Sequence, residues 1–452
     1  MKKLLKSEFV KNSAILTGGT GLAQLIPILI SPILTRLFTP EDYGILGVFN
    51  SVVAVFAVMA AWGYDQAIML PKLQKNSVNL LALSLIASGI TSLFLFLIFL
   101  LFNNSVANLL GNKQIEFWLF FVPLVVFFRG AYESISIWLN KYKEYKSIAT
   151  TKVLTRTVTA TGQILGGVAK IGAAGLIGSV VLGTITGNGL LFIQHQKKLK
   201  EQTKKDISIP RIKYLFKRYQ KFPTYYMPSS LLNSFSLQIP IFILSGFFME
   251  SVVGLYVLGH RILSMPLNVI GRSIGNVFYQ QASSIKSEPD KLKKLAYKTF
   301  RSLILIGLLP LGILAGFGDI IFGFVFGENW IEAGKFAMVI APWMILNFSS
   351  SPISRIITLK ERQEWSLIIN LLLLLIRISP LIIGAVFLYS DNVLNVIILY
   401  SIFNLVFWMW FNIFLLKQVG VSPLIVIKDI IIFMVLPISM IFILRILLGI
   451  EL

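Results

Sequence analysis

The chain is 452 residues long, 56% hydrophobic and only 13% charged, yet it carries 41 lysines and arginines against 20 aspartates and glutamates. A composition this apolar excludes a soluble globular domain of this length and indicates a polytopic membrane protein, whose surplus of basic residues lies in loops facing an anionic membrane surface. Because the sequence has no cysteine and only two histidines, it excludes disulfides, thiolate metal sites and a histidine-based metal centre.

Apolar runs of about 20 residues, the length that crosses a bilayer, recur along the whole chain. The first run follows a basic segment but continues past Ile30 without a small-residue cleavage site, so we expect a retained span and no signal peptide. A last apolar run, 430–448, predicts an extra C-terminal helix that crosses the membrane or re-enters it. The other predicted spans cover residues 12–38, 43–70, 78–102, 117–139, 148–169, 173–194, 222–248, 252–281, 300–326, 336–359, 365–389 and 393–416.

The midpoint of the chain, residues 197–221, interrupts this pattern with ten basic residues and two acids. A segment with this charge stays in water, and its lysines and arginines mark the cytoplasmic side. The segment is therefore read as a linker between an N-lobe of six spans (1–196) and a C-lobe of six spans (222–417), with an extension at 418–452. The predicted fold class is an all-α polytopic membrane protein made of two six-helix lobes. Nucleic acid is not expected as a partner, because the flanking spans already explain the basic charge.

The connections between the predicted spans alternate in charge. Lysines and arginines concentrate in every second connection, beginning with the N-terminus, and acids are more frequent in the connections between. This alternation predicts a cytoplasmic N-terminus. Because each half has an even number of spans, both halves enter the membrane from the same side, and any internal repeat is expected to be parallel.

Charged side chains within the predicted spans carry the functional information. A charge at membrane depth is costly unless it faces water, a partner or a ligand. Cations outnumber acids at these positions, so the interior is expected to attract an anion, and the few acids are candidates for coupling transport to an ion. The predicted substrate-binding residues are Arg261, Arg377, Arg129, Arg272, Arg156, Lys152 and Arg36, and the predicted coupling residues are Asp65 and Glu133.

Several of these residues also have a structural interpretation. Arg129 and Glu133 are four residues apart on one predicted helix, where they would neutralise one another. Lys152 and Arg156 have the same spacing but share a sign, so they repel unless something negative lies between them. No acid lies within four residues of Arg261 or of Arg377, so a local ion pair explains these two arginines least well.

The sequence offers no constellation typical of an enzyme. It has no P-loop, so direct use of ATP is not expected. It also has no large hydrophilic segment that would house a glycosyl-transfer site. We therefore expect a protein that is not an enzyme and has neither catalytic residues nor a metal site, and no cofactor beyond an H⁺ or Na⁺ that drives transport.

Four stretches of the chain form recognisable motifs: LTRLFTPEDYG at 34–44, WGYDQAIMLPK at 62–72, GLYVLGHRILSMPL at 254–267 and VFYQ at 277–280. They resemble the signatures of Wzx-type oligosaccharide flippases, in the polysaccharide-transporter branch of the MOP superfamily. The resemblance covers about residues 6–417 and keeps the order and spacing of the motifs, but Asp65 stands where a glutamate is frequent in the family.

The resemblance implies a MATE-like arrangement of two six-helix lobes around a central cavity, working by alternating access in a bacterial inner membrane. It implies a substrate as well: undecaprenyl pyrophosphate carrying an oligosaccharide repeat unit, moved from the cytoplasmic to the outer leaflet for O-antigen or capsule synthesis. The expected partners are this lipid-linked oligosaccharide, membrane lipids, and the polymerase and chain-length proteins of polysaccharide assembly. The alternative is a MATE-type drug or cation antiporter, whose cavity should be rich in acids.

Overall fold

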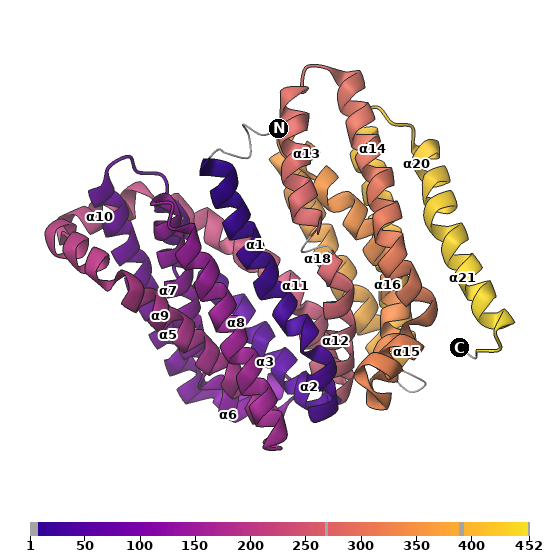
Figure 1. The fold of residues 1–452 in the computed structure, drawn as a ribbon, viewed down its shortest axis with the longest axis horizontal. Helices are drawn as coiled ribbons and strands as arrows, with labels where there is room; N and C mark the ends of the chain where they lie inside the picture. Colours follow the sequence, from indigo (N-terminus) through magenta and orange to yellow (C-terminus); the bar gives the residue numbers. More distant parts are fainter. Residues whose placement is uncertain (1–7, 267–269, 388–392, 451–452) are drawn as a thin grey trace. The chain divides into compact units, whose positions relative to one another are not determined.

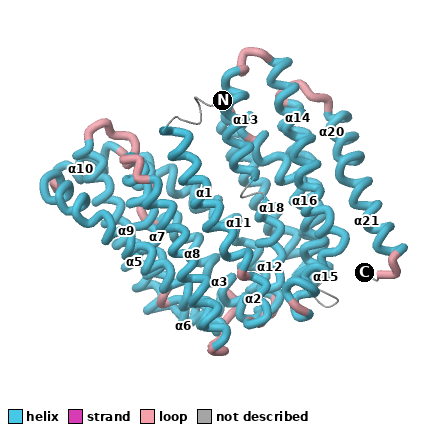
Figure 2. Tube along the Cα trace, in the orientation of Figure 1, coloured by secondary structure: helices cyan, strands magenta, loops and turns pink. Residues whose placement is uncertain are grey.

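The structure, a computed structural model, describes residues 8–266, 270–387 and 393–450. Helices account for most of these residues, and no strand occurs in the ranges given (Figures 1 and 2). The predicted all-α polytopic fold is confirmed. By packing, the chain divides into a first unit, Met1–Val253, and a second unit, Gly254–Leu452.

The first unit is built from helices that pack in neighbouring pairs. Its main contacts join α8 with α9, α1 with α8, α5 with α7, and α3 with α11. Because α11 packs against α3, the first unit extends one helix beyond the basic linker. The assignment of the two lobes by residue range stays a prediction. The helices are α1 (Glu8–Leu29), α2 (Ser31–Leu37), α3 (Pro40–Met59), α4 (Tyr64–Ala67), α5 (Gln74–Leu109), α6 (Glu116–Leu119), α7 (Val122–Lys141), α8 (Tyr145–Val168), α9 (Ala173–Asp206), α10 (Ile209–Arg218) and α11 (Met227–Phe247).

The second unit is organised around α16, which contacts α13, α14, α15 and α19 and contributes many buried apolar side chains. Phe348 on α16 is fully buried and lies against the backbone of α14 at Gly307, where a larger residue would not fit. The helices are α12 (Glu250–Pro266, which begins in the first unit), α13 (Arg272–Ser284), α14 (Pro289–Gly307), α15 (Ile313–Phe326), α16 (Ile331–Ile353), α17 (Arg355–Leu359), α18 (Gln363–Phe387), α19 (Val393–Lys417), α20 (Pro423–Ile430) and α21 (Leu436–Leu447).

Eleven helical segments of the described chain are long and apolar enough to cross a membrane. They include the predicted extra span, Pro423–Leu447, which α20 and α21 form together. Two predicted spans are helical but are not among the eleven. One is α8, which carries Lys152 and Arg156 and is rich in threonine, and the other is divided between α12 and α13. The chain is thus a multi-pass membrane protein.

The start of α3 shows how the local sequence sets a helix boundary. Thr39 has an extended backbone, and its side-chain oxygen accepts from the backbone N–H of Asp42 at 3.4 Å. The Asp42 carboxylate accepts in turn from the Thr39 backbone N–H at 3.1 Å, which completes a capping box. Pro40 occupies the first helical position, where its missing N–H costs nothing. This residue pattern falls inside the 34–44 stretch singled out in the sequence.

The connections of the first unit gather at two ends in the alternation that the sequence predicts. At one end, Lys75 pairs with Asp206 at 3.8 Å, and Lys141 donates to backbone oxygens of the connection before α5. At the other end, Ser245 Oγ donates to the backbone oxygen of Leu110 at 2.5 Å. Basic connections therefore share one end, as a positive-inside arrangement requires. Which end faces the cytoplasm stays a prediction.

In the second unit, α20 and α21 lie along α14 and α15 (Figure 1). Arg301 on α14 pairs with Asp429 on α20 at 3.7 Å, and farther along, Asp319 on α15 pairs with Arg445 on α21 at 2.6 Å. Because the earlier residue of each segment pairs with the earlier residue of the other, the two segments run parallel. The two ion pairs, of opposite polarity, fix the register of the C-terminal segment.

Candidate substrate site

Five of the predicted site residues come together in the first unit. Arg129 and Glu133 lie on α7, Lys152 and Arg156 on α8, and Asp65 on the short α4. Arg129 interacts electrostatically with Arg156, and Glu133 interacts with both Asp65 and Lys152. These residues come from the consecutive helices α7 and α8 and from α4, which lies more than fifty residues earlier, and they form one cluster of three cations and two acids.

The cluster lies on an accessible face of the first unit. Glu133 and Arg156 are exposed, although both lie well inside their helices. A charged side chain exposed to hydrocarbon at this depth would be very unfavourable. We infer that this face of α7 and α8 borders a polar opening and does not face lipid. Tyr132, next to Glu133 on α7, interacts with both Glu133 and Arg156 and adds a hydroxyl to the same face.

The structure decides between the two interpretations of Arg129 and Glu133. Within the described residues, no ion pair joins these two side chains, although they are one turn apart on α7. Arg129 lies within electrostatic range of the cation Arg156, and Glu133 lies within range of Lys152 on the neighbouring helix. The local ion pair that spacing alone allowed is therefore not formed, and the charges of α7 interact at longer range with those of α8.

Asp65 is held at the edge of the cluster, beyond the end of the α3 span. Its carboxylate is buried and accepts a hydrogen bond from Gln66 Nε2 at 2.7 Å. Burial raises the pKa of Asp65, and the hydrogen bonds to its carboxylate oppose the rise only in part. An acid that binds a proton more readily than usual, beside a second acid, suits an ion-coupling role.

A second cluster forms in the second unit around Arg377. Arg377 on α18 interacts with Tyr256 and His260 on α12 and with Tyr400 on α19. The Tyr256 and His260 rings stack with 5.5 Å between centroids, and the two tyrosine side chains interact with each other. Both tyrosines are buried, while Arg377 and His260 are half-buried. Arg377 on α18 therefore lies in a polar and aromatic environment formed by residues of α12 and α19.

Sequence reasoning missed the two tyrosines and their neighbour Asn404, which donates from Nδ2 to the backbone oxygen of Tyr400 at 2.9 Å. The one available signal was spacing, because Tyr256 and His260 lie one helical turn apart. No local pattern links either residue to Tyr400, more than a hundred positions later.

The remaining predicted residues lie elsewhere. Arg261 is half-buried on α12, about 100° around the helix from His260, the residue that meets Arg377. Arg36 is exposed on α2, and the adjacent Leu37 packs against Gly167 of α8. Gly167 is 11 residues from Arg156, or about 16 Å along the helix, so Arg36 is outside the first cluster. The side chain of Arg272 lies outside the described part of the structure.

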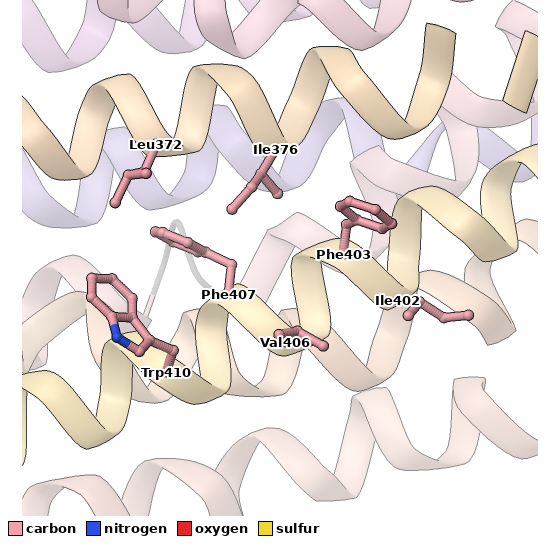
Figure 3. A pocket seen from close by; sticks show the side chains of 7 residues that line it. All are labelled: Leu372, Ile376, Ile402, Phe403, Val406, Phe407 and Trp410. Atoms are coloured by element: carbon pink, nitrogen blue, oxygen red, sulfur yellow. The ribbon is translucent and has the colours of Figure 1, made fainter. Parts of the chain in front are cut away.

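An apolar pocket lies between α18 and α19 (Figure 3). Ile376, Phe403, Phe407 and Trp410 are among the side chains that line it. Because the lining contains no charged side chain, the pocket suits hydrocarbon and not a phosphate. It is therefore distinct in chemistry from both charged clusters.

Residues 33–335 match the model of a family described as polysaccharide biosynthesis protein. The chain belongs to this polysaccharide biosynthesis family. The match includes the whole first cluster and Tyr256, His260 and Arg261 of α12, but it ends before Arg377. A relative from Klebsiella pneumoniae, named an uncharacterized membrane protein in the cps region, is 21% identical over 77% of this chain and 70% of its own length.

Solved structures show the same fold. A lipid II flippase, MurJ, in an inward closed conformation aligns with a TM-score of 0.68 and 15% identity over 95% of this chain and 92% of its own. An inward-facing multidrug-resistance MATE transporter of the MOP superfamily aligns with a TM-score of 0.64 and 16% identity over 88% and 94%. The family match confirms the resemblance to a polysaccharide family, and these structures show that the chain has the fold of MOP-superfamily transporters.

Proposed function

We propose that this protein is a flippase that moves undecaprenyl-pyrophosphate-linked oligosaccharide repeat units from the cytoplasmic to the outer leaflet by alternating access. The observation that carries the proposal is the accessible cluster on α7, α8 and α4, in which three cations meet two acids within a membrane protein of the polysaccharide biosynthesis family. The expected product is a surface polysaccharide such as O-antigen or capsule. The location of the Klebsiella relative in a cps region supports this assignment.

The cluster suits a pyrophosphate group. Lys152 and Arg156 lie one turn apart on α8 and repel one another, and an anion between them would remove that repulsion. Arginine and lysine bind phosphate oxygens through charge-assisted hydrogen bonds, and the planar arginine can do so through two bonds at once. The lipid tail would stay in the bilayer while only the headgroup meets the cations. In the second unit, Arg377 is a separate candidate contact for the substrate.

The two acids provide a route for ion coupling. Glu133 and Asp65 repel one another, and an H⁺ or Na⁺ bound there would relieve the repulsion. Glu133 also competes with the substrate for Lys152. Binding of the ion would therefore release Lys152 for the pyrophosphate, so that ion and substrate binding favour one another.

The proposed orientation places the N-terminus and the basic connections in the cytoplasm of a bacterium, with the protein in its inner membrane. The common end shared by the basic connections of each unit supports this orientation, as in the Lys286–Glu361 pair at 2.9 Å in the second unit. The polymerase and chain-length proteins of polysaccharide assembly are proposed as partners on the outer side.

The proposal is tested by transport in reconstituted vesicles. Undecaprenyl-pyrophosphate-linked oligosaccharide is followed from one leaflet to the other, with and without an H⁺ or Na⁺ gradient. We expect Arg156→Gln to slow transport by about tenfold or more, because it removes a charge-assisted contact of about 1.5–3 kcal/mol. Lys146→Gln is the matched control, since Lys146 is an exposed cation at the end of the same helix. Equal transport by the two variants would remove the cluster from the substrate path.

The MATE-type antiporter alternative is tested in the same vesicles, because MATE structures share the fold. Export of cationic drugs by the wild-type protein, without movement of the lipid-linked oligosaccharide, would establish this alternative. The surplus of cations in the first cluster argues against it, since such a face repels cationic drugs.

A further inference from the structure

The helix α10, within the basic linker, has an exposed face whose composition differs from that of an ordinary solvated loop. Residues 209–221 contain five basic residues and no acid. Apolar side chains are exposed on the same helix: Ile209 is 70% exposed and Phe216 43%. Contact with water explains why the basic side chains are on the surface, but it does not explain why large apolar side chains are exposed beside them.

The helix is held firmly against the first unit. Leu215 is fully buried in a core cluster that includes Tyr64 and Leu80, and Ile212 packs against the same cluster. Tyr64 Oη donates to the backbone oxygen of Phe216 at 3.2 Å. The inward face of α10 is therefore defined, and the position of its outward face follows from helical geometry.

Asn79 on α5 fixes the turn that leads into α10. Its Nδ2 donates to the backbone oxygen of Asp206 at 2.8 Å, and its Oδ1 accepts from the backbone N–H of Ser208 at 3.0 Å. A single buried amide thus satisfies one backbone group on each side of the bend. This anchors α10 beside the start of α5.

The outward side of α10 is divided into an apolar edge and a basic face. At 100° per residue, Ile209 and Phe216 lie within about 20° of one another on one edge, and Lys213 and Lys217 follow next to them. Both lysines are exposed, as is Lys221 just beyond the helix. This order of apolar and basic side chains is typical of a helix that lies in a membrane interface.

The neighbour of α10 indicates what covers this face. The helix packs against α5, a candidate span of which most side chains are not buried. Exposed apolar residues such as Ile86, Leu93 and Phe94 show that the outer side of α5 faces lipid. Because α10 packs beside the end of a lipid-facing helix, its exposed face lies within reach of the bilayer surface, where anionic headgroups carry the charge opposite to that of its lysines.

We propose that α10 is a binding site for anionic phospholipid headgroups of the adjacent leaflet, with Lys213, Lys217 and Lys221 as the main contacts. Ile209 and Phe216 enter the interface beside them. Each lysine near an anionic surface strengthens binding, and the attraction falls within a Debye length. The site takes bulk lipid and is separate from the charged cluster of α7 and α8, so the proposal does not depend on the flippase assignment.

The test uses the full-length protein with one fluorescent label, whose emission does not depend on the polarity of its surroundings. Since the chain has no cysteine, Ile209→Cys accepts a single dye at the edge of α10. The protein is placed in phosphatidylcholine vesicles that contain spin-labelled phosphatidylglycerol or spin-labelled phosphatidylcholine, and the quenching by each lipid is compared. We expect phosphatidylglycerol to be favoured about tenfold at low salt, and this preference to shrink as salt is added.

Two triple variants decide whether α10 causes the preference. Changing Lys213, Lys217 and Lys221 to glutamine is expected to abolish most of it. The control changes three exposed lysines in the first part of α14, residues 289–300, with the same loss of charge, where no large apolar side chain is exposed. Equal quenching by both lipids in the unsubstituted chain, an equal loss in the control, or no quenching by either lipid would overturn the proposal. The control residues are Lys293, Lys294 and Lys298.

Discussion

The buried ion pair between Arg445 on α21 and Asp319 on α15 should be decisive for the stability of the second unit. Two nitrogens of Arg445 donate to the two carboxylate oxygens of Asp319, at 2.7 and 2.6 Å, and one also donates to the backbone oxygen of Gly316 at 2.8 Å. The Arg445 side chain is only 1% exposed and that of Asp319 12%. Water therefore solvates neither charge to a significant extent.

We predict that Arg445→Met is strongly destabilising, because it leaves the Asp319 carboxylate buried without its partner. Breaking a buried pair in this way costs about 3–5 kcal/mol. In a unit of this size, each kcal/mol shifts the midpoint of thermal unfolding by about 2–4 °C, so a decrease of about 10 °C is expected. Unfolding of the detergent-solubilised protein, followed by circular dichroism or by dye binding, measures the shift.

The exposed pair between Lys286 and Glu361 is the matched control. Its distance, 2.9 Å, is similar, but its side chains are 52% and 77% exposed. Lys286→Met should therefore cost less than about 1 kcal/mol and shift the midpoint by a few degrees at most.

The double variant Asp319→Leu with Arg445→Met distinguishes the cost of an unpaired buried charge from the cost of altered packing. It removes both charges and leaves apolar side chains of similar size, so it should recover most of the lost stability. If Arg445→Met lowered the unfolding midpoint no more than Lys286→Met does, the argument from burial would be wrong.

Three further predictions concern transport and topology. Arg261→Ala should abolish most transport per folded molecule and Arg261→Lys should keep part of it, if this residue binds the pyrophosphate mainly through charge; normal specific activity of Arg261→Ala would exclude it from the site. Glu133→Gln should weaken the dependence of transport on an ion gradient, as should Asp65→Asn; gradient dependence that is unchanged in both would place coupling elsewhere. Single cysteines should react with impermeant reagents from the cytoplasmic side only at positions 76, 144 and 288, and from the outside only at 104 and 250, and reaction of position 144 from outside would contradict the orientation.

The sequence alone determined the class of the protein and the positions of its helices. Hydropathy is a property of about 20 consecutive residues, so a span can be recognised without its neighbours. The capping box at Thr39 and Asp42 is equally local. The predicted span α8 has a lower hydropathy than the eleven candidate spans because it contains Lys152 and Arg156, and this can be seen in the sequence itself. The family signatures are also contiguous stretches.

Only the tertiary structure decided which charges meet. Spacing suggested an ion pair between Arg129 and Glu133, but packing of α7 against α8 brings Glu133 within electrostatic range of Lys152 instead. Nothing in the C-terminal run indicated that Arg445 would reach Asp319, 126 positions earlier. The physical reason is that helices in a membrane are defined one at a time by burial in lipid, whereas their side-chain contacts depend on how neighbouring helices pack and rotate. A pair of residues on different helices therefore has no signal in a single sequence, however costly each charge would be alone.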